Sequence, residues 1–225
     1  MKFLILDTSS EILSLALSNQ GRVSDINLHR DIDQDITAVI EAFLGINNLR
    51  LGELDYLCIG LGPGSFTGLR IGCSIIKGLA LGLGKPIVSF SSFYSIAYQS
   101  ILTGSDIAVV KDARRDLVYA GVYKTNKKGK LLQAKLRLAD LRSFLADLKK
   151  TAKKRVVFSG ESFKFASTIK KFFPQAEIFP LTYPLARFMI EEAERRIKNR
   201  RITLPDKLEP LYLYRSDCQV RRRAK

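Results

Sequence analysis

The chain has 225 residues, of which 46% are hydrophobic and 26% are charged. This composition is typical of a folded globular protein, and the length is sufficient for one large domain or two smaller ones with buried cores. A net charge of +15 indicates either a polyanionic partner or a solvated basic face. No apolar run approaches the ~20 residues of a membrane span, so we expect a cytoplasmic protein with no membrane partner.

The cysteine and histidine content argues against metal and redox chemistry. Cys58, Cys73 and Cys218 are odd in number and widely separated, and two of them lie in apolar stretches, so we expect reduced thiols in a core. His29 is the single histidine, which argues against a histidine-based metal site or a His-dependent triad. We therefore expect neither a metal nor a cofactor.

The first hundred residues predict three short strands and then alternating helices and strands. Apolar stretches separated by polar turns, such as Asn19-Gln20-Gly21, are typical of an antiparallel meander. Helical spacing follows, with one apolar face formed by Ile36, Val39, Ile40, Phe43 and Leu44. The expected strands are 3–6, 12–17, 23–28, 56–60 and 86–88, and the expected helices are 33–45, 67–83 and 91–102.

A glycine-dense turn, Gly62-Pro63-Gly64-Ser65-Phe66-Thr67-Gly68-Leu69-Arg70, lies between an expected strand and an expected helix. Its glycines and proline indicate unusual φ angles and a close approach of the backbone to a ligand, a partner or a neighbouring element. Ser65 or Thr67 is expected to cap the helix, whose N-terminus would attract an anion. The turn is not a P-loop, because Leu69 stands in place of the phosphate-binding lysine. These residues alone leave a structural turn and an anion or partner site open.

From residue 106 the pattern of strands and helices begins again. Asp112 follows the first strand of this second half as Asp7 follows the first strand of the chain. The expected strands are 107–110, 117–123, 131–137, 156–158 and 178–179, and the expected helices are 139–150, 163–173 and 185–197. We therefore predict a duplicated α/β fold with an N-terminal lobe, 1–104, and a C-terminal lobe, 105–225, that ends in a basic tail.

The string Gly-Pro-Gly-Ser-Phe-Thr-Gly-Leu-Arg-Ile-Gly at residues 62–72 resembles the signature of the bacterial TsaB (YeaZ) family. Three further matches occur in the right order: Leu6-Asp7-Thr8-Ser9, Asp112-Ala113-Arg114 followed by Val118-Tyr119-Ala120-Gly121, and Pro210-Leu211-Tyr212-Leu213. The resemblance implies a two-lobed, duplicated ribonuclease-H-like fold of the actin, sugar kinase and Hsp70 superfamily.

The resemblance also implies a function. The family is a non-catalytic accessory subunit of the complex that transfers a threonylcarbamoyl group to N6 of the adenosine 3′ of the anticodon, in tRNAs reading codons that begin with A. The implied partners are a catalytic TsaD-like transferase subunit, a TsaE-like ATPase subunit and tRNA within the complex, with a homodimer when the chain is alone.

The implied functional residues form two sets. The cleft or ligand loop comprises Asp7, Thr8, Gly62, Gly64, Ser65, Thr67, Gly68, Arg70, Asp112 and Arg114. The partner interface lies on the two helices around the glycine turn and comprises Ile36, Val39, Ile40, Phe43, Gly72, Ile75, Ile76 and Leu79. Glycine inside a helix costs about 1 kcal/mol relative to alanine, so Gly68, Gly72, Gly78 and Gly82 indicate close packing against another helix or the protein's own sheet.

Some observations leave alternatives open. Many family members have a His-Ser-Glu triplet where this chain has Ile32-Asp33-Gln34, which leaves a modified partner surface open. The basic stretches 149–155, 195–201 and 221–223 suit contact with a tRNA backbone, or form a solvated basic face. The alternative functions are a small kinase or peptidase-like hydrolase that uses the interlobe cleft, and a general nucleic-acid binder.

Overall fold

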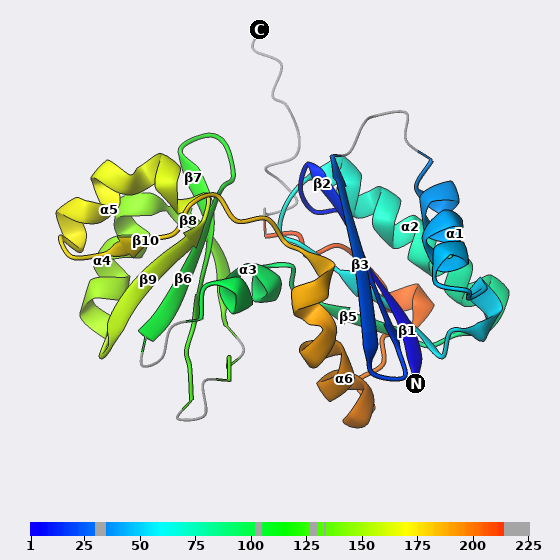
Figure 1. The fold of residues 1–225 in the computed structure, drawn as a ribbon. Coiled ribbons are helices and arrows are strands. Elements are labelled where there is room, and N and C mark those ends of the chain that lie inside the picture. Colours follow the sequence, from blue (N-terminus) through cyan, green and yellow to red (C-terminus); the bar gives the residue numbers. More distant parts are fainter. Residues whose placement is uncertain (30–34, 102–104, 127–129, 133, 214–225) are drawn as a thin grey trace, which may run out of the picture. The chain divides into compact units, whose positions relative to one another are not determined.

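The computed structural model describes residues 1–29, 35–101, 105–126, 130–132 and 134–213. These residues form two compact units, each built around a five-stranded sheet (Figure 1). The first unit contains Met1–Gln99 and Thr182–Pro210, and the second contains Ser100–Leu181 and the segment after Pro210. The Ile32-Asp33-Gln34 triplet, Cys218 and the basic stretch 221–223 lie outside the described residues.

The first sheet combines an antiparallel meander with two parallel strands. Its order is β3-β2-β1-β4-β5, with β1 antiparallel to β2 and parallel to β4. A tight turn at Gln20 and Gly21, both with positive φ, joins β2 to β3 as the polar turn predicts. The strands are β1 (Lys2–Asp7), β2 (Ile12–Asn19), β3 (Arg22–His29), β4 (Tyr56–Gly60) and β5 (Ile87–Phe90).

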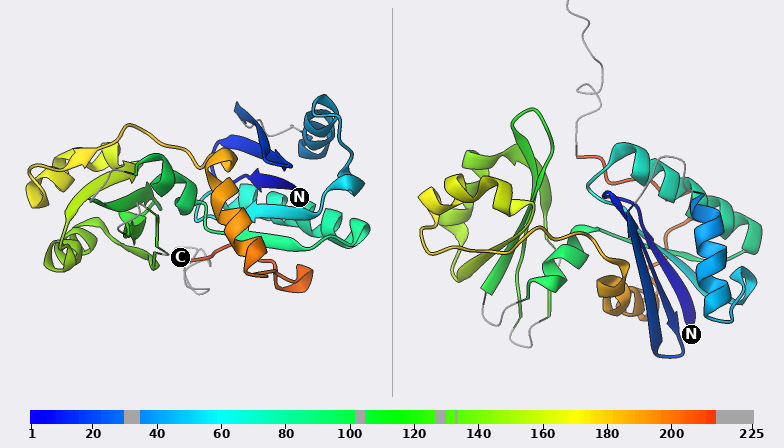
Figure 2. Two further views of the ribbon diagram at one scale, coloured as in Figure 1. Left: turned by 60° about the horizontal axis from the view of Figure 1, so that its bottom comes forward. Right: turned by 45° about the horizontal axis from the view of Figure 1, so that its top comes forward.

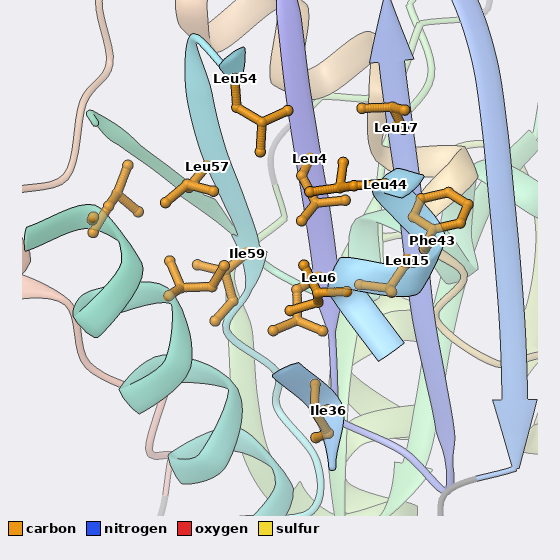
Figure 3. Packing of buried hydrophobic residues seen from close by; sticks show 14 of the residues in the cluster. Leu4, Leu6, Leu15, Leu17, Ile36, Phe43, Leu44, Leu54, Leu57 and Ile59 are labelled. Atoms are coloured by element: carbon orange, nitrogen blue, oxygen red, sulfur yellow. The ribbon is translucent and has the colours of Figure 1, made fainter. Parts of the chain in front are cut away.

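Two helices, α1 (Ile36–Ile46) and α2 (Phe66–Leu83), cover one face of this sheet. Asp35 caps α1, since its Oδ1 accepts hydrogen bonds from the backbone N–H groups of Thr37 and Ala38 at 2.9 and 3.2 Å. The side chains of α1 pack against those of the strands, as Figure 3 shows for Leu4, Leu6, Leu15, Leu17, Ile36, Phe43, Leu44, Leu57 and Ile59. Cys73, Ile76 and Ala80 of α2 belong to the same core. Burial of these apolar faces provides the main stabilisation of the unit.

The opposite face of the first sheet is covered by a segment that follows the second unit in the chain. The short helix η3 (Ala186–Met189) and α6 (Ile190–Lys198) pack there, and α3 (Phe93–Gln99) lies beside η3. Figures 1 and 2 show α6, coloured orange, against the blue and green strands. The core on this side contains Phe3, Ile5, Ala16, Cys58, Val88, Phe90, Ala186, Met189, Ala193 and Ile197. The expected lobe 105–225 therefore differs from the second unit, because residues 182–210 return to the first.

The second unit repeats the topology of the first. Its order is β10-β9-β6-β7-β8, with β6 antiparallel to β7 and parallel to β9. Helices α4 (Leu141–Thr151) and α5 (Ala166–Phe172), with η2 (Ser162–Phe165) before α5, pack on one face. The strands are β6 (Ser105–Asp112), β7 (Leu117–Tyr123), β8 (Leu136–Asp140), β9 (Arg155–Gly160) and β10 (Glu177–Ile178). The duplicated α/β fold predicted from the sequence is confirmed.

Two expected elements begin later than the sequence suggested. The strand predicted at 131–137 is Leu136–Asp140, because pairing with β7 runs from Leu136 opposite Gly121 to Asp140 opposite Leu117, whereas Leu131 forms only an isolated bridge with Thr125. The helix predicted from residue 139 begins at Leu141, because Asp140 Oδ1 accepts a hydrogen bond from Ser143 N at 2.9 Å and caps it. This hydrogen bond also lowers the pKa of the Asp140 carboxyl. Helix η1 (Leu51–Glu53) and helix η4 (Pro205–Lys207) were not anticipated.

Helix α2 begins one residue before the predicted range of 67–83 and ends where that range ends. In the described part of the chain it is the one helix that, by length and composition, could cross a membrane. However, Leu69, Cys73, Ile76 and Ala80 are buried, and Cys73, Ile76 and Ala80 belong to the core that α2 shares with the sheet. Packing within the first unit therefore accounts for one apolar face of α2.

Candidate functional site

Three turns meet at one edge of the first sheet. Strands β1, β4 and β5 run parallel, with Leu6 opposite Ile59 and Gly60 opposite Phe90. Their carboxyl ends therefore lie at the same edge, which is where ligands bind in many open α/β sheets. The turn after β1 begins at Asp7, and the turn after β4 is the glycine-dense segment.

The turn after β1 lies directly against the glycine-dense segment. A Cβ atom added to Gly60 would overlap the Asp7 carboxylate, and one added to Gly64 would overlap the Ser9 carbonyl oxygen. Neither neighbour is the flexible end of a long side chain, so a larger residue would displace the turn. The close approach that the glycines predicted is therefore to the protein's own backbone and to Asp7.

Thr8 ties the same turn to α2. Its hydroxyl donates a hydrogen bond to the Gly68 carbonyl oxygen at 2.7 Å, within the first turns of the helix. One helical turn later, a Cβ atom on Gly72 would overlap Thr8 Oγ1. Gly68 and Gly72 are both buried, and they let α2 approach the end of β1.

Asp7 is buried at the end of β1, and its carboxylate stabilises the turn that follows. Its Oδ1 accepts hydrogen bonds from the Ser9 backbone N–H at 2.8 Å and from Ser9 Oγ at 2.6 Å. Such bonds to a residue two positions later are the usual role of aspartate at a turn. This geometry matches the turn-capping interpretation of Asp7.

Gly62 joins the turn after β4 to the turn after β5. Its N–H donates to Ser92 Oγ at 2.9 Å, and its carbonyl oxygen accepts from Ser92 N at 2.9 Å and Ser91 Oγ at 3.0 Å. Its φ of +90° favours glycine, and the Gly62–Pro63 peptide bond is cis. A further backbone hydrogen bond, from Ser65 N to the Ser9 carbonyl oxygen, joins the turn after β1 to the turn after β4, so all three turns at this edge are connected.

Ser65 is the residue that caps α2, as one of the two sequence alternatives predicted. Its Oγ accepts from Gly68 N at 3.3 Å, and its own N–H donates to the Ser9 carbonyl oxygen at 2.8 Å. Thr67, the other alternative, lies inside the helix and is exposed.

The exposed Arg70 places its guanidinium carbon 4.0 Å from the centroid of the Phe66 ring, a cation–π contact. This edge therefore presents a helix N-terminus and one arginine to an anion.

Asp112 and Arg114 lie in the second unit, in the turn between β6 and β7. Asp112 Oδ1 accepts from Arg114 N at 2.8 Å, and Asp112 N donates to Glu161 Oε2 at 3.3 Å. Arg114, Arg115 and Asp116 all have positive φ, at 64°, 54° and 61°. This left-handed conformation costs residues other than glycine about 1–2 kcal/mol each. Asp112 follows β6 as Asp7 follows β1, but it is exposed.

The cysteines and acidic residues offer little metal-binding chemistry. Burial raises the pKa of the Cys58 thiol far above its usual value and that of Cys73 to about 11. Both are buried free thiols, as the sequence predicted. No group of three or more His, Cys, Asp or Glu side chains within the described ranges could hold a metal ion.

The interface residues that the resemblance implied lie largely in the core. Ile36, Ile40, Phe43 and Ile76 are buried between the helices and the sheet. Val39, Ile75 and Leu79 are partly buried against the same core, and Gly72 faces Thr8. The assignment of the four buried side chains to a partner surface is corrected, because helical periodicity identifies an apolar face without saying what covers it.

Helix α2 also has an outward face, which includes Gly78 and Gly82, two of the four glycines that indicated close packing against another helix or the protein's own sheet. Ile71 is 40% exposed and Leu81 is 66% exposed, while Ile46 at the end of α1 is 79% exposed. Gly78 and Gly82 lie on the same face of α2, and nothing comes within 4 Å of a Cβ atom added to either. We call Ile71, Gly78, Leu81 and Gly82 the outward face of α2. The sequence contains a signal for this face. Ile71, Gly78, Leu81 and Gly82 follow one another at intervals of seven, three and one residues, which places them on one side of a helix, opposite the side that carries Cys73, Ile76 and Ala80.

Comparison with known sequences identifies related proteins. A family model described as "TsaD: tRNA N6-adenosine threonylcarbamoyltransferase" matches residues 27–197. Proteins named tRNA threonylcarbamoyladenosine biosynthesis protein TsaB are similar to this chain. The Haemophilus influenzae protein is 35% identical over 53% of this chain and 52% of its own length. The Escherichia coli protein is 35% identical over 57% and 58%. The matched part of the chain thus spans little more than half of these relatives, whereas a Buchnera aphidicola relative is 25% identical over 93% and 96%.

Solved structures share the fold. YeaZ from Pseudomonas aeruginosa superposes with a TM-score of 0.80 at 23% identity, covering 94% of this chain and 99% of that one. A putative N-acetylmannosamine kinase from Listeria monocytogenes has a TM-score of 0.51 at 10% identity, covering 89% and 100%. At these identities the likeness concerns the fold alone, and it agrees with the duplicated α/β architecture.

Proposed function

The chain belongs to the threonylcarbamoyltransferase family whose model matches residues 27–197, as one of its TsaB (YeaZ) members. On that premise we propose that the chain is an accessory subunit in tRNA threonylcarbamoyladenosine synthesis. It binds and activates a catalytic TsaD-like subunit that transfers the threonylcarbamoyl group to the adenosine 3′ of the anticodon. The complex also takes up a TsaE-like ATPase subunit and tRNA, and it works in the cytoplasm.

The packing of the glycine turn supports an accessory role over a catalytic one. Gly60 and Gly64 are explained by Asp7 and Ser9, which occupy the space that a side chain at either glycine would need. Asp7 uses Oδ1 to hold the turn after β1. The constraint at this edge thus serves the fold, and the relatives do not favour the small kinase or peptidase-like hydrolase.

The outward face of α2 supports a partner-binding role and carries this proposal. Glycine costs about 1 kcal/mol relative to alanine inside a helix, so Gly78 and Gly82 weaken α2 without relieving any clash within the chain. Beside them, Leu81 and Ile71 expose apolar surface that a partner would bury. Small residues next to exposed apolar ones let a second helix approach closely. We assign this face to the TsaD-like subunit and, when the chain is alone, to a second copy.

Reconstitution tests the role in modification. Unmodified tRNA, ATP, threonine and bicarbonate would be mixed with the carbamoyl-adenylate synthase and the TsaD-like and TsaE-like subunits, all from one organism. Formation of threonylcarbamoyladenosine is expected to require this chain. Equal product with and without the chain would contradict the accessory role and return attention to the Gly62 turn as an active site.

Paired variants test the binding face. Gly78→Arg and Leu81→Asp are expected to weaken binding to the TsaD-like subunit at least tenfold, because each places a charge where apolar contact forms. Val23→Asp, at an exposed apolar residue on β3, is the matched control and is expected to bind normally. Binding would be measured by calorimetry after thermal unfolding shows that the variants fold. Equal binding by all three would place the interface elsewhere.

A further inference from the structure

The excess positive charge of the chain is carried by its second unit and by the segment after Pro210. The first unit contains 14 basic and 14 acidic residues, whereas Ser100–Leu181 contains 18 basic and 7 acidic residues. An overall charge of +15 therefore comes from a neutral unit joined to a strongly basic one. A polyanion is attracted to one part of the molecule and not to the whole surface.

Six exposed lysines gather at one end of the second sheet. Strands β6 and β9 start at this end, since Ser105 is paired with Arg155, and β7 ends there, since Tyr123 is paired with Ile107. The last turn of α4 leads into the same end. We call this surface the lysine end, formed by Lys124, Lys130, Lys149, Lys150, Lys153 and Lys154.

Hydrogen bonds hold the segments of the lysine end side by side. Lys154 Nζ donates to the Thr125 carbonyl oxygen at 3.1 Å, which joins the turn before β9 to the turn after β7. The buried Thr125 hydroxyl donates to the Ser105 carbonyl oxygen at 2.8 Å. Leu132 N donates to the Lys124 carbonyl oxygen at 2.8 Å and closes the hairpin that carries Lys124. These bonds hold the segment that carries Lys124 beside the segment that carries Lys154.

The acidic side chains near this end pair with arginines or are buried. Glu177 pairs with Arg155 at 2.6 Å, and Asp147 pairs with Arg137 at 2.9 Å. Asp106 is 5% exposed, so its carboxylate lies below the surface. The nearby carboxylates are thus taken by arginines or buried.

The basic stretch at 195–201 is compensated within the first unit. Glu192 accepts hydrogen bonds from Arg195 Nη2 at 2.7 Å and from Arg196 Nε at 2.6 Å. Arg196 also donates to the Ser89 carbonyl oxygen at 2.6 Å, so both arginines serve the packing of α6. The stretch 221–223 lies outside the described residues.

The dipole of α4 explains only part of the lysine end. Lys149 and Lys150 lie in the last turn of α4, where positive charge offsets the partial negative charge of the helix. Lys153, Lys154 and Lys124 lie beyond the helix, where this effect has decayed. The helix dipole does not account for these three lysines, although Lys154 also bonds to Thr125. Phosphate groups suit such a surface, because several separate positive charges attract a phosphate backbone without reading its sequence.

We propose that the lysine end binds the phosphate backbone of RNA. The identity of this RNA as tRNA rests on the proposed function, in which the complex takes up tRNA. The contact needs no base recognition. It positions the tRNA through the second unit, while the outward face of α2, in the first unit, is kept for the protein partner.

Salt-dependent binding of unmodified tRNA to the full chain tests the proposal. Lys149→Ala/Lys150→Ala/Lys153→Ala is expected to lower affinity at least tenfold and to reduce the slope of log K against log salt by about 2–3, one counterion for each lost phosphate contact. The control Arg22→Ala/Lys198→Ala/Arg201→Ala removes the same charge from exposed residues of the first unit. It is expected to bind as the unaltered chain does.

Two outcomes of these binding measurements would overturn the proposal. Equal losses in the two triple variants would mean that net charge acts without a local surface. Equal affinity for poly-glutamate of matched charge would identify an acidic protein as the partner. Modification assays across tRNA concentrations separate this proposal from the proposed function. If a lysine-end variant needs a higher tRNA concentration to reach the same rate of modification, both the RNA contact and the accessory role are supported. If the chain binds tRNA but has no effect on modification, only the accessory role is contradicted.

Discussion

Individual glycines in this chain have opposite effects on stability, depending on what surrounds them. Gly72 faces Thr8, whereas Gly78, less than two turns later in the same helix, faces open space. Both positions are helical, so the intrinsic preference for alanine is the same at each. The difference in stability between an alanine substitution at Gly72 and one at Gly78 therefore measures what the contact between α2 and the end of β1 contributes to the stability of the chain.

Gly78→Ala is expected to stabilise the isolated chain by up to about 1 kcal/mol, because alanine favours helix and meets no neighbour. Gly72→Ala is expected to destabilise it by about 1–3 kcal/mol, because the new methyl displaces Thr8 and its hydrogen bond to Gly68. Urea unfolding measures both effects. Adding Thr8→Ala to Gly72→Ala should recover part of the loss, and strict additivity would contradict the contact.

Glu192 provides a pH-dependent contribution to the first unit. Burial raises the pKa of its carboxyl, but hydrogen bonds from Arg195 and Arg196 together outweigh burial and lower it. A folded-state pKa below the unfolded value stabilises the protein above the unfolded pKa of about 4.3, and this stabilisation is lost as pH falls through the folded pKa.

Glu192→Gln is expected to destabilise the chain by about 1–3 kcal/mol at pH 7, because two arginines lose their carboxylate partner. The difference from the unaltered chain should shrink as pH falls below the unfolded pKa of about 4.3 and through the lower folded pKa, where Glu192 itself becomes neutral. Urea unfolding between pH 3 and pH 7 measures this. A difference that stays constant with pH would mean that Glu192 acts through packing alone.

At the scale of elements, α2 is held at both ends by specific caps. Ser65 caps its N-terminus through Gly68 N, and Gly84, with a φ of 62°, ends it in the left-handed conformation. The same serine bonds through its backbone to Ser9, so the cap also places the helix against the turn after β1. The start of α2 and the edge of the sheet therefore form one unit of structure.

Ser65→Ala is expected to destabilise the chain by about 1 kcal/mol through loss of the cap, while Ser65→Thr keeps a hydroxyl and most of the stability. Thermal unfolding compares the two. Thr67→Ala serves as the control, since Thr67 is exposed inside the helix, and a loss there equal to that of Ser65→Ala would move the cap to Thr67.

At the scale of the whole molecule, the first unit depends on a segment that the chain supplies last. Ala186, Met189 and Ala193 are fully buried against β1, β2 and β5, so the sheet is covered on both faces only after the second unit has been made. The second unit, by contrast, has the contiguous core segment Ser100–Leu181.

Met189→Asp is expected to unfold the first unit selectively, because it places a charge in the core between α6 and the sheet. Hydrogen exchange should show lost protection in β1, β2 and α2, with protection kept in β6, β7 and β9. Simultaneous loss in both units would mean that they fold as one cooperative body.

Local patterns in the sequence determined the order of the elements, the duplication, and the choice of Ser65 or Thr67 as the residue that caps α2. Alternating and helical periodicities report burial directly, so Leu4, Leu57 and Ile40 were expected in elements and lie in cores. The TsaB resemblance of residues 62–72 likewise needed no structure. What such patterns lack is the identity of the covering group, since a core and a partner bury the same apolar face.

Only the tertiary structure decided what the glycines and the apolar faces meet. Gly64 approaches Ser9, 55 positions earlier in the numbering, and Met189 covers Phe3, because strand pairing and sheet packing bring distant segments together. The same packing placed Ile76 inside and left Gly78 and Leu81 outside. The charge excess was visible in the sequence, but the gathering of Lys124 with Lys154 depended on the hairpin and the turn that meet at one end of the second sheet.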